Sequence, residues 1–339
     1  MRPLCRSAVL VVSALLWTAA ALAQEAPDFK GKTINVVIGF EAGGSYDIYG
    51  RLFARFFGAH LPGQPTIVVQ NMPGAGGLGA ANYLYNVAPR DGTAVGVISQ
   101  TAGIGQVLDT PGIRYDVRKF AWIGRLVANA QVLHTWYTSK TRTMADALTN
   151  EVVVAGTGPT SSSVVFPHIM NDLLGTKFKV VPGYNGPTSA TLAMERGEVE
   201  GVVRPWSELK AMNPDWLRDK KINLLVQFAL TPNAEIRDVP AVVDLGHDDQ
   251  QRQLLALFAS GNDVGNAIVA PPGLTGPVAA ALRKAFDDVM NDPAFLAAAH
   301  VAKLDLDPLP GDKLQKLNES TLEVPDKVIE QAKKYSGGG

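Results

Sequence analysis

Two loops rich in glycine and hydroxyl side chains carry the residues best suited to bind a ligand. The first runs over residues 39–47 (GFEAGGSYD) and the second over residues 156–163 (GTGPTSSS). Glycine lets the backbone approach a ligand closely, hydroxyl groups add hydrogen-bond donors, and the amino end of a helix leaves N–H groups unpaired. Each loop follows a strand-like run and precedes a helix-like pattern. We therefore expect the two loops to form two halves of one anion-binding cleft.

A purely structural interpretation of the same loops also stands. Ser45 or Asp47 could serve only as a helix cap, and the run Thr160–Ser163 only as a capped turn. The binding interpretation makes the stronger prediction. In it, backbone donors of residues 42–45 and hydroxyl groups of residues 160–162 hold carboxylate oxygens.

Patterns typical of catalysis or metal binding are missing from the sequence. It contains neither H-E-x-x-H nor G-x-S-x-G, and the serine-rich loop has no evident base. A periplasmic hydrolase would need a Ser–His–acid group that the spacing does not reveal. The prediction is a binding protein, not an enzyme, with no metal and no cofactor. The histidines are dispersed, at His60, His134, His168, His247 and His300.

The run Gly74–Gly79 (GAGGLG) matches the G-x-G-x-x-G pattern of dinucleotide sites. Pro73 separates this run from the preceding strand, and the next strand, 94–100, does not end in an acidic residue. The context therefore favours glycines that allow tight packing at the start of a helix.

Residues 1–23 have the three parts of a secretory signal. Arg2 and Arg6 precede an apolar core, Ala8–Trp17, and Ala21–Ala23 form a small-residue cleavage site. The apolar stretch is short for a membrane span. We expect cleavage near Ala23 and a periplasmic location.

Composition bounds the remaining possibilities. Cys5 is the only cysteine, so the mature chain of 316 residues must be stabilised by its core rather than by disulfides. Removal of Arg2 and Arg6 with the leader changes the formal charge from −1 to −3. This balance gives no electrostatic reason to expect a nucleic-acid partner.

Alternating strand-like and helix-like segments predict an α/β fold with mostly parallel sheets. Helices are expected after Asp47 and from Pro277 onward. The expected strands are 33–40, 66–70, 94–99, 131–137, 152–155, 179–181, 199–203, 223–228 and 266–269.

An ordered set of short motifs spans almost the whole mature chain and resembles the substrate-binding proteins of tripartite tricarboxylate transporters, the Bug or TctC family. The motifs are Gly43-Gly44-Ser45 with Asp47 and Arg51, residues 68–77 (VVQNMPGAGG), 89–93 (PRDGT), 156–158 (GTG), 181–186 (VPGYNG), 196–201 (RGEVEG), 237–240 (RDVP) and 270–273 (APPG).

This resemblance implies a type II periplasmic binding protein, in which two α/β lobes are joined by two crossovers around a ligand cleft. By analogy, residues 24–126 and 229–339 form lobe 1, and residues 127–228 form lobe 2. Such a receptor is expected to be monomeric and to work with membrane transporter subunits. A sensor that passes the closed shape to a signalling partner is the alternative binding function.

The resemblance places the ligand between the first strand-to-helix loop and the Gly/Ser loop of the second lobe. Gln100 and Thr101 end a strand beside this cleft, and Tyr184 is a further candidate. The predicted ligand-binding residues are Phe40, Glu41, Ala42, Gly43, Gly44, Ser45, Asp47, Gln100, Thr101, Gly158, Thr160, Ser161, Ser162, Tyr184, Arg204 and Trp206.

Three departures from the family pattern bear on the ligand. Glu41 and Ala42 stand where small residues or proline are usual, and the Glu41 carboxylate would oppose an anion unless it points away, is protonated or meets a positive group. Arg204-Pro205-Trp206 offers a guanidinium for a carboxylate and a flat face for a ring, which suggests an aromatic or bulky acid. An Arg204 ion pair with Glu200 or Glu208 is the alternative.

The sequence therefore predicts a periplasmic receptor that captures a small organic acid and presents it to a tripartite membrane transporter. Ligand binding would stabilise the closed arrangement of the lobes.

Overall fold

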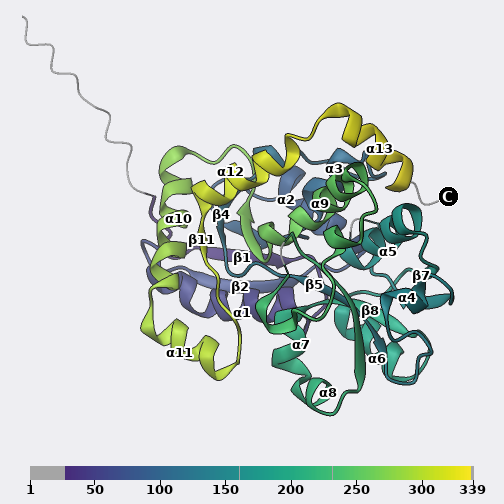
Figure 1. Cartoon of the computed structure of the whole chain (residues 1–339). Coiled ribbons are helices and arrows are strands. Elements are labelled where there is room, and N and C mark those ends of the chain that lie inside the picture. Colours follow the sequence, from purple (N-terminus) through teal and green to yellow (C-terminus); the bar gives the residue numbers. More distant parts are fainter. Residues whose placement is uncertain (1–26, 160, 231, 337–339) are drawn as a thin grey trace, which may run out of the picture.

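The strands of the chain form two separate sheets, with helices on both faces of each (Figure 1). The computed structural model describes residues 27–159, 161–230 and 232–336; the expected signal peptide therefore lies outside the described residues. The first sheet has the order β11-β4-β10-β3-β1-β2, and the second β7-β6-β8-β5-β9. The strand bounds are β1 Thr33–Ile38, β2 Thr66–Asn71, β3 Ala94–Val97, β4 Ala121–Arg125, β5 Gln131–Trp136, β6 Val152–Ala155, β7 Phe178–Val181, β8 Gly201–Pro205, β9 Ile222–Phe228, β10 Ala267–Ala270 and β11 Leu309–Pro310.

Most helices lie between consecutive strands and cover the sheet faces. The α-helices are α1 Ser45–Phe57, α2 Leu78–Asn86, α3 Ala102–Val107, α4 Met144–Ala147, α5 Ser162–Leu174, α6 Pro187–Glu195, α7 Trp206–Met212, α8 Pro214–Arg218, α9 Asp249–Val264, α10 Gly276–Met290, α11 Pro293–Val301, α12 Gly311–Leu322 and α13 Asp326–Ser336. Short 3₁₀ turns are η1 Gly58–His60, η2 Ala75–Gly77, η3 Val117–Lys119, η4 Ala234–Ile236 and η5 Val242–Leu245.

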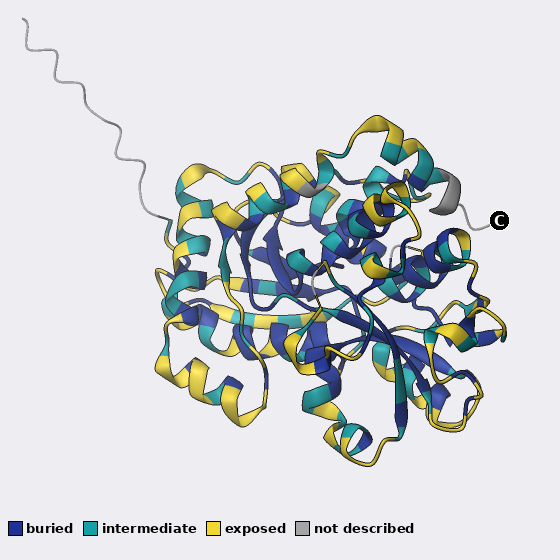
Figure 2. Ribbon diagram, in the orientation of Figure 1, coloured by how far each residue is buried: buried dark blue, intermediate teal, exposed yellow. Residues whose placement is uncertain are grey.

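The central strands β3, β8 and β10 are buried along their whole length, and they belong to the dark blue core of Figure 2, whereas the edge strand β2 has no buried residue. In β1, Val36 and Ile38 belong to a buried cluster with side chains of α1 and α10, whereas Val37 belongs to a second cluster with side chains of α2 and α12. The period of two along a strand explains this division. The helices predicted after Asp47 and from Pro277 onward are confirmed as α1 and α10, and both bury apolar side chains in the same cluster as Val36 and Ile38.

The prediction of mostly parallel sheets is wrong, because both sheets are mixed. In the first sheet, β10 pairs antiparallel with β3 and β4, and in the second, β5 pairs antiparallel with β8 and β9. The chain crosses from one sheet to the other just before β5, and it returns before β10. Strands β5 and β10 therefore begin at the end of their sheets where the parallel strands finish. Each of them must run in the opposite direction to those strands.

Strand β4 was not predicted, because Gly124 and Arg125 interrupt its apolar pattern. The contacts of Gly124 and Arg125 explain why these residue types occur in the strand. A Cβ at Gly124 would lie 2.3 Å from the Phe286 ring, and the buried Arg125 guanidinium donates to Asp307 Oδ2 at 2.7 Å.

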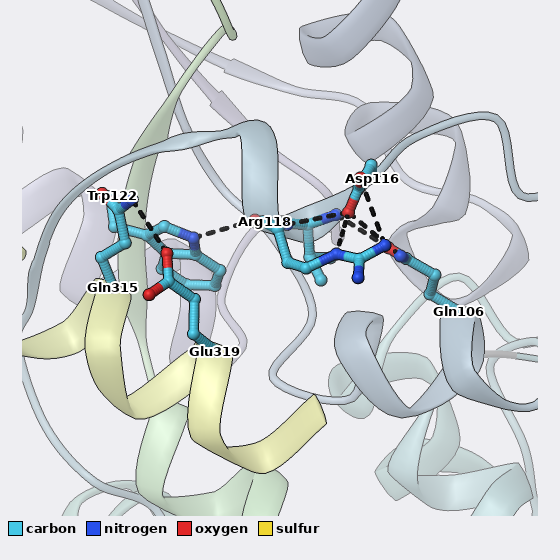
Figure 3. A network of polar contacts seen from close by, with 7 residues as sticks. Gln106, Asp116, Arg118, Trp122, Gln315 and Glu319 are labelled. Atoms are coloured by element: carbon cyan, nitrogen blue, oxygen red, sulfur yellow. Dashed lines mark hydrogen bonds and ion pairs between the residues drawn. The ribbon is translucent and has the colours of Figure 1, made fainter. Parts of the chain in front are cut away.

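The end of the chain packs across both sheets. Helix α12 lies against β4, whereas α13 packs on α5 and α9 in a cluster that includes side chains of the second sheet. Figure 3 shows the segment that leads into β4, where Gln106 donates to Asp116 and the Trp122 indole donates to the Val117 carbonyl at 2.9 Å. The chain leaves the first sheet at Arg125 and enters the second at Gln131. It leaves the second sheet at Phe228 and re-enters the first at Ala267. The expected lobe boundaries, which also assign the helices, stay a prediction.

Candidate functional site

A cavity of about 30 Å³ lies where the carboxyl ends of strands from both sheets meet. Open α/β sheets commonly bind ligands at this edge. The volume holds no more than a few water molecules, so a larger ligand can enter only if the two sheets separate. The lining residues are Phe40, Ser45, Tyr46, Ser99, Gln131, Ala155, Thr157, Ser161, Ser162, Ser163, Pro187, Ala190, Val202, Val203, Pro205 and Glu208.

The first loop leads from β1 into α1 and is fixed by Asp47. Its carboxylate accepts hydrogen bonds from the Gly43 amide at 2.9 Å, Arg51 Nε at 2.8 Å and Asn71 Nδ2 at 2.8 Å. Burial disfavours the charged form, but these hydrogen bonds and the charge of Arg51 outweigh it and lower the pKa of Asp47. Asp47 therefore shapes the loop, and it does not line the cavity.

The amino end of α1 receives a carboxylate from the other side of the cleft. Glu208, on α7 directly after β8 of the second sheet, accepts a hydrogen bond from the Ser45 amide through Oε2 at 3.1 Å. Its side chain is only 2% exposed, and it lines the cavity. The protein's own carboxylate thus occupies a position that the sequence suggested for a ligand.

Glu41 makes the reciprocal contact. From the first loop it reaches α6, where its Oε1 accepts the Ser189 amide hydrogen at 2.7 Å. Gly186 leaves room for it, since a Cβ there would lie 2.7 Å from Glu41 Cγ. The departure at Glu41 therefore places a carboxylate at a helix amino end outside the cavity lining, where the helix dipole favours negative charge.

Arg204 is paired with Glu208, which is one of the two partners considered from sequence. Its Nε and Nη2 donate to Glu208 Oε1 at 3.1 and 2.6 Å, and Nη1 donates to Asn213 at 2.9 Å. Trp206 donates through Nε1 to Glu235 at 2.6 Å. Neither Arg204 nor Trp206 lines the cavity; their roles as ligand contacts stay predictions.

The second loop presents a linked set of hydroxyl groups. Ser161 Oγ donates to the Gly158 carbonyl at 2.8 Å and lies 2.9 Å from Ser163 Oγ. Ser163 Oγ accepts the Thr157 amide hydrogen at 3.1 Å. Ser162 lines the same wall. The wall therefore offers hydroxyl groups that can reorient to donate to an anion.

Glycines of the two halves touch where these walls meet. A Cβ at Gly158 would lie 2.2 Å from both the Ala75 carbonyl carbon and the Gly76 nitrogen. A Cβ at Gly76 would lie 2.8 Å from the Ser161 nitrogen. The GAGGLG run thus packs at the start of α2, as expected, and also permits close approach across the cleft.

Four predicted ligand-binding residues line the cavity, namely Phe40, Ser45, Ser161 and Ser162. Thr160 lies outside the described residues. The other described candidates do not line the cavity: Glu41, Ala42, Gly43, Gly44, Asp47, Gln100, Thr101, Gly158, Tyr184, Arg204 and Trp206.

Sequence reasoning missed two lining residues that are prominent in the structure, Tyr46 and Glu208. The Tyr46 ring stacks on Phe40 with centroids 4.4 Å apart, and burial raises the pKa of its hydroxyl to about 12. The neutral phenol therefore remains a possible donor. The position of Tyr46 beside Ser45 was the available signal for Tyr46. The signal for Glu208 was its opposite charge four positions after Arg204, although Arg204 lies in β8 and Glu208 in the first turn of α7.

His134 on β5 gives the site a pH-dependent neighbour. It is fully buried, its Nε2 has no hydrogen-bond partner in the described structure, and burial together with the Arg204 charge lowers its pKa to about 3. The unfolded chain therefore takes up this proton first, and stability is lost as the pH falls from about 6.5 toward 3, by up to about 1.4 kcal/mol per pH unit.

We expect His134→Gln to flatten the fall in unfolding free energy between about pH 6 and pH 4. Urea unfolding of wild type and variant across this range measures the difference. Parallel pH profiles for the two proteins would contradict the role assigned to His134.

Comparisons with known proteins agree with this architecture. The model of the tripartite tricarboxylate transporter family receptor matches residues 59–333. The chain belongs to this family. A UPF0065 protein of Cupriavidus necator, from the gbd 5′ region, is 27% identical over 316 residues, which cover 90% of this chain and 88% of that protein.

Solved structures of periplasmic binding proteins share the fold of this tripartite tricarboxylate receptor. BugD superposes with a TM-score of 0.70 at 20% identity, covering 89% of this chain and 97% of BugD. MatC from Rhodopseudomonas palustris, solved with bound malate, gives 0.69 at 22% identity and covers 88% and 98%. The type II binding-protein fold is thereby confirmed.

The receptor is a solute-binding protein of a transport family, as predicted, and not an enzyme. Within residues 27–159, 161–230 and 232–336, no helix combines the length and apolar character needed to cross a bilayer. The same residues contain no cluster of three or more potential metal ligands among His, Cys, Asp and Glu.

Proposed function

We propose that this receptor captures a small organic acid in the periplasm and delivers it to a tripartite tricarboxylate-type membrane transporter. The observation that carries the proposal is the cavity between the first loop and the serine-rich loop, in a chain of this receptor family. The solved MatC structure with malate supports a carboxylate as the ligand class. Cleavage near Ala23 would release the receptor as a monomer.

Binding would proceed by separation and closure of the two halves. The ligand enters when the halves part, because the closed cavity of about 30 Å³ is too small for an organic acid. Closure then surrounds the ligand with donors from both loops. The ligand can favour the closed form only through the difference between its affinities for the closed and open states.

An aromatic acid is the finer form of the proposal. The cavity offers the stacked rings of Phe40 and Tyr46 on one side and Val202, Val203 and Pro205 on the other. These surfaces would pack on a flat ligand, and offset or edge contacts between rings add about 0.5–1.5 kcal/mol. Arg204 and Trp206 would then act from behind the cavity wall.

The test is a thermal-shift survey of the purified mature protein with aliphatic acids, aromatic acids, amino acids and neutral solutes. Calorimetry confirms hits, and chromatography checks that each bound acid is recovered unchanged. We expect saturable stabilisation by acids that increases with the logarithm of ligand excess. Stabilisation by neutral solutes alone, or conversion of a bound acid, would contradict the proposed function.

A further inference from the structure

We infer that Glu208 selects the charge of the ligand, so that the receptor prefers a monocarboxylic acid carrying a hydroxyl, amide or ammonium donor over a dicarboxylate. This inference rests on the proposed function, since it assumes that an organic acid enters the cavity. It deepens that function by assigning opposite chemical demands to the two ends of the ligand.

The charges around the cavity support this selection. Glu208 is the only described lining residue with an acidic or basic side chain; the others are apolar, hydroxyl-bearing or, at Gln131, an amide. No lysine or arginine appears among the described lining residues. A ligand with two carboxylates would therefore meet a negative charge without a cation on the cavity surface to offset it.

Glu208 is held in place before any ligand arrives. Arg204 donates twice to its Oε1, and the Ser45 amide donates once to its Oε2. Arg204 itself is only 4% exposed and lies outside the cavity lining. The buried pair keeps the carboxylate aimed at the amino end of α1.

The same geometry leaves a place for a ligand donor. A carboxylate offers about four acceptor positions, and the described hydrogen bonds use three of them at Glu208. A hydroxyl, amide or ammonium group of the ligand would complete the set. A ligand carboxylate at this end would instead compete with Glu208 for the Ser45 amide.

The opposite wall suits the single carboxylate of such a ligand. Thr157, Ser161, Ser162 and Ser163 line it with hydroxyl groups. Hydroxyl donors can stabilise one carboxylate without a cation, because hydrogen bonds to a charged group are stronger than those between neutral groups. The cavity thus has one wall for an anion and one wall for a donor.

Matched acids test this inference. At each chain length from malonate to suberate, and for terephthalate, calorimetry compares the diacid with its monoamide and with the corresponding hydroxy and amino monoacids. We expect wild type to bind the best donor-bearing monoacid at least about tenfold more tightly than the diacid of equal length.

Two glutamate variants separate charge from position. Glu208→Gln keeps the side-chain size and removes the charge, and it is expected to shift the diacid-to-monoacid affinity ratio by about tenfold or more toward the diacid. Glu200→Gln is the matched control; Glu200 bonds to Ser139 away from the cavity, and its loss should leave the ratio unchanged. If Glu208→Gln does not fold, the double variant Arg204→Met/Glu208→Gln removes both buried charges and serves the same comparison.

The outcomes distinguish the inference from the function on which it rests. Tightest wild-type binding of a diacid, or an unchanged ratio in Glu208→Gln, would overturn the role of Glu208 and leave the acid receptor intact. If none of these acids binds, both the inference and the proposed function are contradicted. A donor-bearing monoacid preference that weakens in Glu208→Gln alone supports the inference.

Discussion

Replacement of Gly158 by alanine is expected to weaken ligand binding by about ten- to a hundredfold. The added Cβ would lie 2.2 Å from backbone atoms of Ala75 and Gly76 across the cleft. Backbone cannot move aside as a flexible side chain can, so the two halves would have to stay apart. Overpacking of this kind costs about 1–3 kcal/mol, and here the cost falls on the closed state.

Calorimetry with the best acid from the survey measures this loss. Gly79→Ala is the matched control, because a Cβ at Gly79 meets nothing within 4 Å in the same glycine run. The melting temperature of each unliganded variant reports any local backbone strain separately. Wild-type affinity in Gly158→Ala would contradict the view that the glycines permit closure.

Removal of the Arg204 side chain is expected to lower the free energy of unfolding by about 3–5 kcal/mol. Arg204→Ala would leave the Glu208 carboxylate, 2% exposed, without its main partner. Breaking one side of a buried ion pair costs more than removing both charges, because the remaining charge is desolvated and uncompensated. The double variant Arg204→Met/Glu208→Gln should therefore be more stable than Arg204→Ala.

Urea unfolding of the three proteins measures these energies, and calorimetry measures their affinity for the acid. A loss of stability below about 1 kcal/mol in Arg204→Ala would show that the pair is dispensable. Unchanged affinity in a folded Arg204→Ala protein would also remove Arg204 from the ligand-binding residues.

The sequence predicted the loops of the cavity because their residue types have local consequences. Glycine and serine after a strand produce a turn and a helix start, and both expected loops reach the cavity lining through Phe40, Ser45, Ser161 and Ser162. The mixed sheets were missed because strand direction depends on where the chain crosses between sheets. That crossing leaves no periodic signal at β5 or β10.

Contacts across the cleft could not be derived from local patterns. Ser45 and Glu208 are 163 positions apart, and Glu41 and Ser189 are 148 apart. Sequence analysis identified Glu41 as the carboxylate that would decide the ligand's charge, whereas the structure places Glu208 on the cavity. The Arg204–Glu208 pair could be considered from sequence because two opposite charges stand only four positions apart, Arg204 in β8 and Glu208 in the first turn of α7.

A crystal structure of the receptor with its tightest acid tests the central claim most directly. The account predicts density for the acid between the rings of Phe40 and Tyr46 and the wall formed by Thr157, Ser161, Ser162 and Ser163, with its carboxylate on the serine hydroxyls. Density for the acid elsewhere on the protein, with this cavity still closed, would contradict it.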